Sequence, residues 1–228
     1  MPAPPPESEP AIVSARGLPV ESLVMTSAAS AVVSPTIVDL IAAPTSGVRL
    51  LAVVFVTALT AAASQVSFPV PFTPVPFTLQ PMVVLIGGAM LGARLGASAQ
   101  VLYLLLGIAG LPVFAFAPEL PQGMLRLLGP SGGYLMAYPL AAFLTGALAQ
   151  RGLDRRFSTN LVAMALGLAV IFAGGVLWLA RDFGLAAALG VGFTPFIVVD
   201  AIKVIAAAVV MPAAWRVLRS WGLGVLGF

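Results

Sequence analysis

The 228-residue sequence contains no cysteine and no histidine. Lack of cysteine excludes disulfides, thiolate metal ligands and thiol nucleophiles, and lack of histidine removes the commonest metal ligand and general base. We therefore expect no metal site. Charged residues are also scarce at 8%, against roughly a quarter in an ordinary soluble domain, whereas 60% of residues are hydrophobic and the mean hydropathy is +1.08. This composition is typical of an integral membrane protein.

Long apolar runs account for most of the chain after its first forty-odd residues. A helix needs about 20 apolar residues to cross the hydrocarbon of a bilayer. The sequence therefore predicts an all-α membrane bundle of six transmembrane helices, of which the second is short for a full crossing and contains Gly87 and Gly88. The predicted spans are Leu50–Val66, Leu79–Leu91, Leu95–Gly110, Gly133–Leu148, Leu161–Ala180 and about 195–214.

Basic residues predict the orientation of this bundle. In a six-span arrangement only Arg126 and Arg181 fall on one side, whereas seven arginines fall on the other: Arg49, Arg94, Arg151, Arg155, Arg156, Arg216 and Arg219. The positive-inside rule then places both termini in the cytoplasm of a protein of the plasma or inner membrane. The net charge of +3 comes from scattered basic residues without interleaved aromatics, so a nucleic-acid partner is not expected.

The first 45 residues differ from the rest. Prolines surround Glu7 and Glu9, and the first basic residue is Arg16, so a secretory signal peptide is not indicated. We predict a flexible proline-rich extension over residues 1–45 and a six-helix transmembrane substrate-binding domain over residues 46–228. Ser34 and Pro35 also resemble the cap and first position of a short interfacial helix, which leaves a weakly ordered segment as the alternative.

Two outer connectors are apolar and yet unsuited to helix. Ser67–Thr78 contains prolines that remove backbone donors and disfavour helix at the preceding residues. Irregular backbone at membrane depth is tolerated only where protein covers it or where it lines a cavity. The connector is therefore either a lid over a pocket or a loop on the headgroups. The connector from Leu111 to Tyr134 is again rich in apolar, proline and glycine residues, and two such loops suggest a covered pocket that opens outward.

Asp200 and Lys203 are the charged residues that stand inside an apolar run, and Lys203 is the only lysine. At a spacing of three residues the two side chains share one helix face. Ionisable residues at this depth usually mark a substrate or ion site, and a carboxylate beside an ammonium suits a neutral, hydrogen-bonding head group. A structural ion pair is the alternative.

Further polar and small residues have two interpretations each. Gln100 and Tyr103, three residues apart, could contribute an amide and a phenol to the same pocket or make polar contacts between helices. Ala58 and Ala62 form a small-residue face of the first span, which suits either close docking of another helix or internal packing.

Two other classes of function remain alternatives. An ion-coupled secondary carrier would use Asp200 as its protonation site, although no inverted repeat is evident. An intramembrane enzyme would use Asp200 and Lys203 as acid and base, but a second carboxylate at that depth is absent from the sequence. Lys203 lacks the upstream glycines of a phosphate-binding loop, so energy for transport must come from elsewhere.

Six blocks in order resemble the biotin transporter family, the substrate-specific S component of energy-coupling-factor transporters. The blocks are Pro74–Gln80 (PVPFTLQ), Leu91–Gly96 (LGARLG), Tyr103–Gly107 (YLLLG), Gly110–Phe114 (GLPVF), Gly129–Tyr134 (GPSGGY) and Pro195–Lys203 (PFIVVDAIK). The resemblance covers about residues 50–214. The long extension before Leu50 departs from the compact family pattern.

The resemblance implies a non-enzymatic protein that binds biotin from outside with high affinity. It places Asp200 and Lys203 in the binding motif, and Gln80, Phe114 and Tyr134, which stand in the blocks, are further candidate ligands beside Gln100 and Tyr103. It also implies a transmembrane coupling subunit and two ATPase subunits, docked on the first span at Ala58 and Ala62. No cofactor is expected, because ATP would be used only by the partners. Spacing alone does not select biotin over another vitamin.

Overall fold

The computed structural model describes Met1 and residues 34–41, 45–116 and 121–221, which are largely helical. Residues from Ser34 onward belong to one compact unit. The helices are α2 (Ile37–Ile41), α3 (Ser46–Gln65), α4 (Gln80–Leu91), α5 (Ala93–Ile108), α6 (Met124–Leu128), α7 (Gly132–Ala149), α8 (Phe157–Phe183), α9 (Leu185–Gly192) and α10 (Ile197–Ser220), with a 3-10 turn η1 (Leu153–Arg155). Residues 2–33, most of the predicted extension, lie outside the described residues.

Every predicted span coincides with a helix, but the helices differ in length. By length and composition, α3, α7, α8 and α10 are long and apolar enough to cross a membrane, whereas α4 and α5 are shorter apolar helices of 12 and 16 residues. At 1.5 Å per residue α4 extends only about 18 Å, well short of the roughly 30 Å of hydrocarbon. The structure therefore supports four spans, and the full crossing by α4 and α5 stays a prediction.

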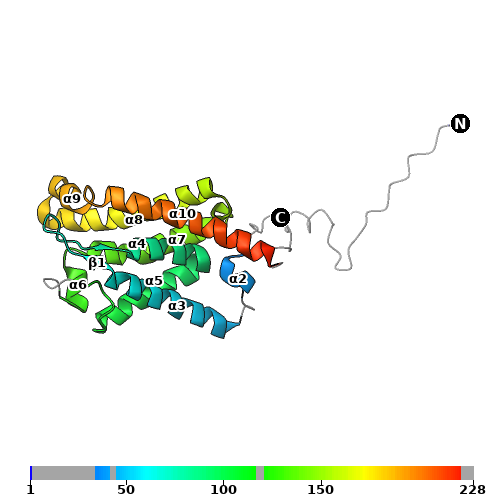
Figure 1. The fold of residues 1–228 in the computed structure, drawn as a ribbon, viewed down its shortest axis with the longest axis horizontal. Helices are drawn as coiled ribbons and strands as arrows, with labels where there is room; N and C mark the ends of the chain where they lie inside the picture. Colours follow the sequence, from blue (N-terminus) through cyan, green and yellow to red (C-terminus); the bar gives the residue numbers. More distant parts are fainter. Residues whose placement is uncertain (2–33, 42–44, 117–120, 222–228) are drawn as a thin grey trace. The chain divides into compact units, whose positions relative to one another are not determined.

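Helix α7 is the centre of the bundle (Figure 1). It packs against α4, α5 and α8, while α3 lies outside α4 and α5, and α10 lies against α8 and α4. Of the apolar stretch of α7, 61% is buried, compared with 28% for α3. One long face of α3 is therefore free of contacts with the rest of the described chain.

Glycines allow the backbones of α4, α5 and α7 to approach closely. A Cβ atom on Gly96 of α5 would lie 2.8 Å from the Cα atom of Gly88 on α4, and one on Gly88 would meet the carbonyl oxygen of Ala142 on α7. Small residues at such contacts are typical of membrane helices, because close packing replaces the hydrophobic driving force. Gly92, with φ of 82°, makes the turn between α4 and α5 in the left-handed region that favours glycine.

The proline-rich connector forms a short hairpin, the exception to the predicted all-α fold. Strands β1 (Ser67–Phe68) and β2 (Phe77–Thr78) pair antiparallel, with Ser67 opposite Thr78. This hairpin, α6 and α9 lie at one end of the bundle, and α2 lies at the other (Figure 1). We call these the outer and inner ends, after the predicted orientation.

Helix α2 begins at Ile37, two residues after the predicted start. The Asp39 carboxylate accepts hydrogen bonds from the Thr36 backbone N–H (3.0 Å) and hydroxyl (2.8 Å), which resembles half of a capping box. Ile37 is buried in the main core. Residues 34–41, within the range predicted as an extension, are therefore packed against the bundle and contain a short helix, and the interfacial position of that helix stays a prediction.

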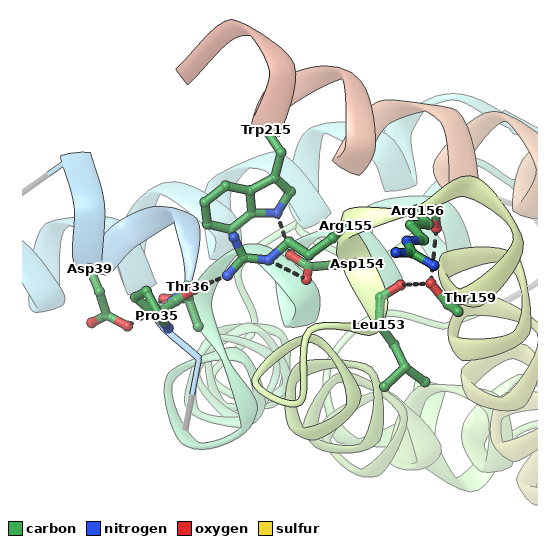
Figure 2. Close-up of polar contacts among 9 residues, drawn as sticks. All are labelled: Pro35, Thr36, Asp39, Leu153, Asp154, Arg155, Arg156, Thr159 and Trp215. Atoms are coloured by element: carbon green, nitrogen blue, oxygen red, sulfur yellow. Dashed lines mark hydrogen bonds and ion pairs between the residues drawn. The ribbon is translucent and has the colours of Figure 1, made fainter. Parts of the chain in front are cut away.

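A polar cluster at the inner end holds three segments together (Figure 2). The buried Asp154 carboxylate accepts from the Trp215 indole N–H (2.5 Å) and from Arg155 Nε (3.2 Å). The Arg155 guanidinium lies 3.4 Å from the centre of the Trp215 ring and donates to the Pro35 carbonyl oxygen (2.8 Å). Burial raises the pKa of Asp154, although the Trp215 and Arg155 hydrogen bonds act in the opposite direction. This inner clasp joins η1, α10 and the segment before α2.

Candidate binding site

Asp200 and Lys203 form an ion pair near the outer end of α10. Lys203 Nζ lies 2.6 Å from Asp200 Oδ1, and Asp200 is only 3% exposed. Lys203 also donates to the Thr78 carbonyl oxygen on β2 at 2.6 Å. The two charges therefore compensate each other, and the ammonium ties α10 to the hairpin.

This pair stands in the wall of a small cavity of about 40 Å³. The hairpin, α7, α8 and α10 all contribute side chains to the wall: Val75, Pro76, Thr78, Pro81, Tyr134, Tyr138, Ile171, Phe172, Phe196, Asp200 and Lys203. The Phe77 ring stacks on Phe196 with centroids 4.4 Å apart. The cavity thus has one charged end and an otherwise aromatic and aliphatic lining.

A second cavity of about 40 Å³ shares five of these residues and carries a different polar end. Its lining consists of Val75, Pro76, Thr78, Gln80, Phe114, Ala115, Arg126, Ser131, Tyr134, Leu135 and Tyr138. Because Val75, Pro76, Thr78, Tyr134 and Tyr138 border both cavities, we treat the two as one bipartite site. Its ends are the Asp200–Lys203 pair and the Arg126 guanidinium with Gln80 and Ser131.

Arg126 is 2% exposed although it stands in the short helix α6 of an outer connector. Its Nη2 donates to the Ala115 carbonyl oxygen at 2.7 Å. Burial lowers the pKa of Arg126 from its ordinary value, because a low dielectric disfavours the charged form. An anionic ligand group beside the guanidinium would oppose this effect.

The structure brings five of the seven predicted ligand residues to the bipartite site. Asp200, Lys203 and Tyr134 line the first cavity, and Gln80, Phe114 and again Tyr134 line the second. The Tyr134 hydroxyl donates to the Gly192 carbonyl oxygen at 2.6 Å, which fixes the ring against α9.

Tyr103 and Gln100 lie elsewhere. Tyr103 supports the site from behind, because Gln80 Nε2 donates to its hydroxyl (2.6 Å) and its ring meets Phe114 edge to face. Gln100 instead donates to the Thr60 hydroxyl (3.2 Å) between α5 and α3 and lines neither cavity. The shared-pocket expectation for this pair is thus corrected: they face different neighbours, and the contacts of Gln100 match the alternative of a polar contact between helices.

Sequence reasoning missed Arg126, Tyr138 and Ser131. Arg126 was assigned only to the outer side, although it precedes the Gly129–Tyr134 block by three residues. Tyr138 stands one turn after Tyr134 on α7 and is therefore on the same helix face. That spacing is the signal that could have found it.

Ala58 and Ala62 lie on the exposed face of α3. The opposite face buries Val53, Val56 and Thr60 against the bundle. The interpretation of Ala58 and Ala62 as internal packing residues is therefore not supported by the contacts of this chain. Among the described residues no cluster of three or more acidic side chains could hold a metal ion.

Comparison with known proteins gives consistent matches. A family model described as the BioY family matches residues 25–220. The probable biotin transporter BioY of Pyrococcus horikoshii is 41% identical over 153 residues, which are 67% of this chain and 87% of that protein. The biotin transporter BioY of Thermotoga maritima is 40% identical over 62% of this chain and 81% of its own length. A crystal structure of the S-component for biotin from an ECF-type ABC transporter superposes with a TM-score of 0.66 at 28% identity, covering 74% of this chain and 90% of that one.

Proposed function

The chain belongs to the BioY family, and from this premise we propose that it captures biotin for uptake as the membrane-embedded S component of an energy-coupling-factor transporter. As a family member it is a multi-pass membrane transport protein and not an enzyme. The observation that carries the proposal is the bipartite site, whose two polar ends match the two polar groups of biotin across an apolar middle.

The ureido group of biotin suits the Asp200–Lys203 end. A carboxylate accepts only, so Asp200 can take hydrogen bonds from the ureido N–H groups. An ammonium has three N–H donors, and the bonds of Lys203 to Asp200 and Thr78 leave one for the ureido oxygen. The rings of Phe196, Tyr134 and Tyr138 offer apolar surface to the sulfur-containing ring.

The carboxylate of biotin suits the Arg126 end. A guanidinium binds carboxylates through charge-assisted hydrogen bonds, and does so more strongly in a dry site than in water. Gln80 and Ser131 line the same cavity and add neutral polar groups. This assignment gives the acidic chain of the vitamin a direction within the site.

The walls of the site must move apart to admit biotin. Each cavity holds about 40 Å³, whereas small-molecule sites usually span about 300 to 1,000 Å³. The hairpin is the wall held by side-chain links to α10, namely the Lys203–Thr78 hydrogen bond and the Phe77–Phe196 stack. We assign it the role of the lid.

The proposal includes partners, because this chain carries a binding site and no nucleotide-binding loop. The expected partners are a transmembrane coupling subunit and two ATPase subunits, which contact the exposed face of α3 at Ala58 and Ala62.

We further propose that α4 and α5 complete six spans, that both termini are cytoplasmic, and that the protein resides in the cell membrane. The basic residues of the inner connectors support that orientation.

Equilibrium titration of the purified protein with labelled biotin tests the function. We expect saturable binding without ATP, and no saturable binding below the millimolar range would overturn the proposal. In the Arg126→Gln variant, biotin affinity should fall by about 1.5 to 3 kcal/mol, the contribution of a hydrogen bond to a charged group. Affinity for the neutral amide of biotin should change little. Arg181→Gln, which removes an exposed outer arginine, is the matched control.

A further inference from the structure

Helix α10 contains a proline whose missing hydrogen bond is replaced by a side chain of another helix. Pro212 lies inside α10 and has no backbone N–H, so the carbonyl four residues earlier, that of Ala208, loses its helical donor. In a membrane interior an unsatisfied carbonyl is costly. Asn160 Nδ2, from the first turn of α8, donates to the Ala208 carbonyl oxygen at 3.1 Å and approaches that of Ala207 at 3.5 Å.

This contact is isolated from solvent. Asn160, Ala207 and Ala208 are fully buried. Among the described residues Asn160 Oδ1 has no hydrogen-bond partner, so the hydrogen bonds of this side chain there both go to α10. A buried amide kept with one polar atom unpaired needs a compensating role, and the role that the geometry offers is to hold α10.

The same two helices build the wall of the binding site. From Asn160, α8 continues to Ile171 and Phe172 at the cavity. From Ala208, α10 runs back to Asp200 at the same cavity, so the two helices are antiparallel. The Phe172 ring meets Phe193 edge to face at 5.0 Å, near the outer end of this pair. A shift of α10 by one residue against α8 would therefore displace Asp200 and Lys203 from the cavity, because successive helix residues differ by about 1.5 Å along the axis and about 100° around it.

On the far side of Pro212, α10 is held separately. The inner clasp binds Trp215 through Asp154 and Arg155 (Figure 2). A helix weakened at a proline is prone to bend there, and the clasp contacts only the part of α10 that follows Pro212. Asn160 contacts the part of α10 that precedes Pro212, on the same side of the proline as Asp200 and Lys203.

We propose that Asn160 is a positioning residue for the ligand site: by replacing the hydrogen bond lost at Pro212, it sets the register of Asp200 and Lys203 against α8. This inference rests on the proposed binding function. The part of α10 after Pro212 is held by the clasp, and Asn160 adds a contact to the outer part, which Lys203 also ties to the hairpin. Affinity for the ligand then depends on a residue that does not line either cavity.

A double-mutant cycle tests this role. Asn160→Leu keeps the approximate volume and leaves the Ala208 carbonyl without a donor, so biotin affinity should fall roughly tenfold, the equivalent of the penalty for one buried unpaired group. Pro212→Ala restores a backbone N–H for that carbonyl. The double variant Asn160→Leu/Pro212→Ala should therefore recover affinity to within about threefold of Pro212→Ala alone, because the binding-competent register is populated again.

Thr57→Val is the matched control for stability. It removes a buried hydrogen bond between helices, from the Thr57 hydroxyl to the Ala99 carbonyl oxygen, away from α10. It should lower the melting temperature and leave biotin affinity unchanged. If Asn160→Leu behaves in the same way, Asn160 is structural only and the proposal is overturned. Loss of affinity without rescue by Pro212→Ala overturns the link to the proline.

Two further outcomes remain decisive. If Asn160→Leu alone does not accumulate in membranes, recovery of folded, biotin-binding protein in the double variant supports the proposal, and its failure to recover opposes it. If the parent protein binds no biotin, the proposed function fails instead. The coupling between positions 160 and 212 is then measured from melting temperatures, which need no ligand. If the two substitutions change the melting temperature additively, the proposed link between Asn160 and Pro212 is overturned.

Discussion

At the residue scale, Asp200 and Lys203 are buried as a pair of opposite charges. The Asp200 carboxylate and Lys203 ammonium are 2.6 Å apart and nearly inaccessible. In this low dielectric, removal of one partner costs more free energy than the intact pair contributes, because the remaining charge is buried without a counter-ion. The pair is therefore sensitive to substitution whichever of its members meets the ligand.

Replacement of Asp200 by asparagine should weaken biotin binding. The variant loses a charge-assisted acceptor and leaves Lys203 without its counter-ion, so we expect a loss of about 2 to 5 kcal/mol, by analogy with truncated buried pairs. Titration with labelled biotin measures the change. Asp182→Asn, which alters an exposed surface pair, should bind like the parent. Equal affinity in the Asp200 variant would reduce the pair to a structural role.

The inner clasp predicts a pH dependence of stability. Because burial raises the pKa of Asp154, the folded protein holds this proton more tightly than the unfolded chain does. The resulting stabilisation is complete below the ordinary pKa near 4 and is lost as pH rises through the folded pKa. Trp215→Phe removes a hydrogen bond that lowers this pKa, so the loss should extend to higher pH.

Melting temperatures between about pH 4 and pH 7, the range above the ordinary aspartate pKa, measure this effect. Relative to Asp154→Asn, which does not titrate, the parent should become less stable as pH rises through that range. Melting curves that stay parallel for the parent and Asp154→Asn would show that Asp154 does not control the dependence.

At the element scale, α3 is the least buried of the four helices long and apolar enough to cross a membrane. It buries Val53, Val56 and Thr60 inward and exposes Ala58 and Ala62. Small residues four apart permit the close backbone approach by which membrane helices associate. Helix α8 exposes a similar pair, Ala165 and Ala169, and so offers a comparison within the same protein.

Enlarging Ala58 and Ala62 to tryptophan should abolish co-purification with the coupling subunits and leave biotin binding nearly intact. The bulky side chains would block close helix approach on a face that lies away from both cavities. The same change at Ala165 and Ala169 should preserve the complex. Survival of the complex with enlarged α3 would place the docking face elsewhere, and a collapse of binding would assign these alanines to packing.

At the scale of the whole molecule, the two ends of the bundle carry different elements. The hairpin, α6 and α9 lie at one end, and α2 lies at the other (Figure 1). Arg126 stands in α6, and the inner clasp includes Pro35, just before α2. The exposed arginines of the inner side include Arg94 in the first turn of α5, Arg151 and Arg156 between α7 and α8, and Arg216 near the end of α10. By the positive-inside rule this end should face the cytoplasm.

Single introduced cysteines give a clean test of this orientation, since the natural chain has none. A membrane-impermeant thiol reagent applied outside should label Phe72→Cys in the hairpin connector, where the native side chain is 61% exposed. Arg156→Cys should react only after the membrane is permeabilised. Outside labelling of Arg156→Cys in sealed cells would reverse the orientation.

The sequence by itself determined the membrane class, the positions of the six longer apolar helices and the pairing of Asp200 with Lys203, but not the short helices α6 and α9. These features follow from composition, from the length of apolar runs and from the three-residue spacing on one helix, all of which are local.

Tertiary structure alone decided which of the predicted residues meet at the site and which further residues join them. It paired β1 with β2, turned Gln100 toward Thr60, and carried Arg126 and Tyr138 to the same cavity. It also placed the Asn160 side chain within hydrogen-bond distance of the Ala208 carbonyl, 48 residues later in the chain. Each of these contacts joins segments whose meeting depends on how whole helices pack, and helix periodicity fixes which face a residue occupies but not which neighbour that face will meet.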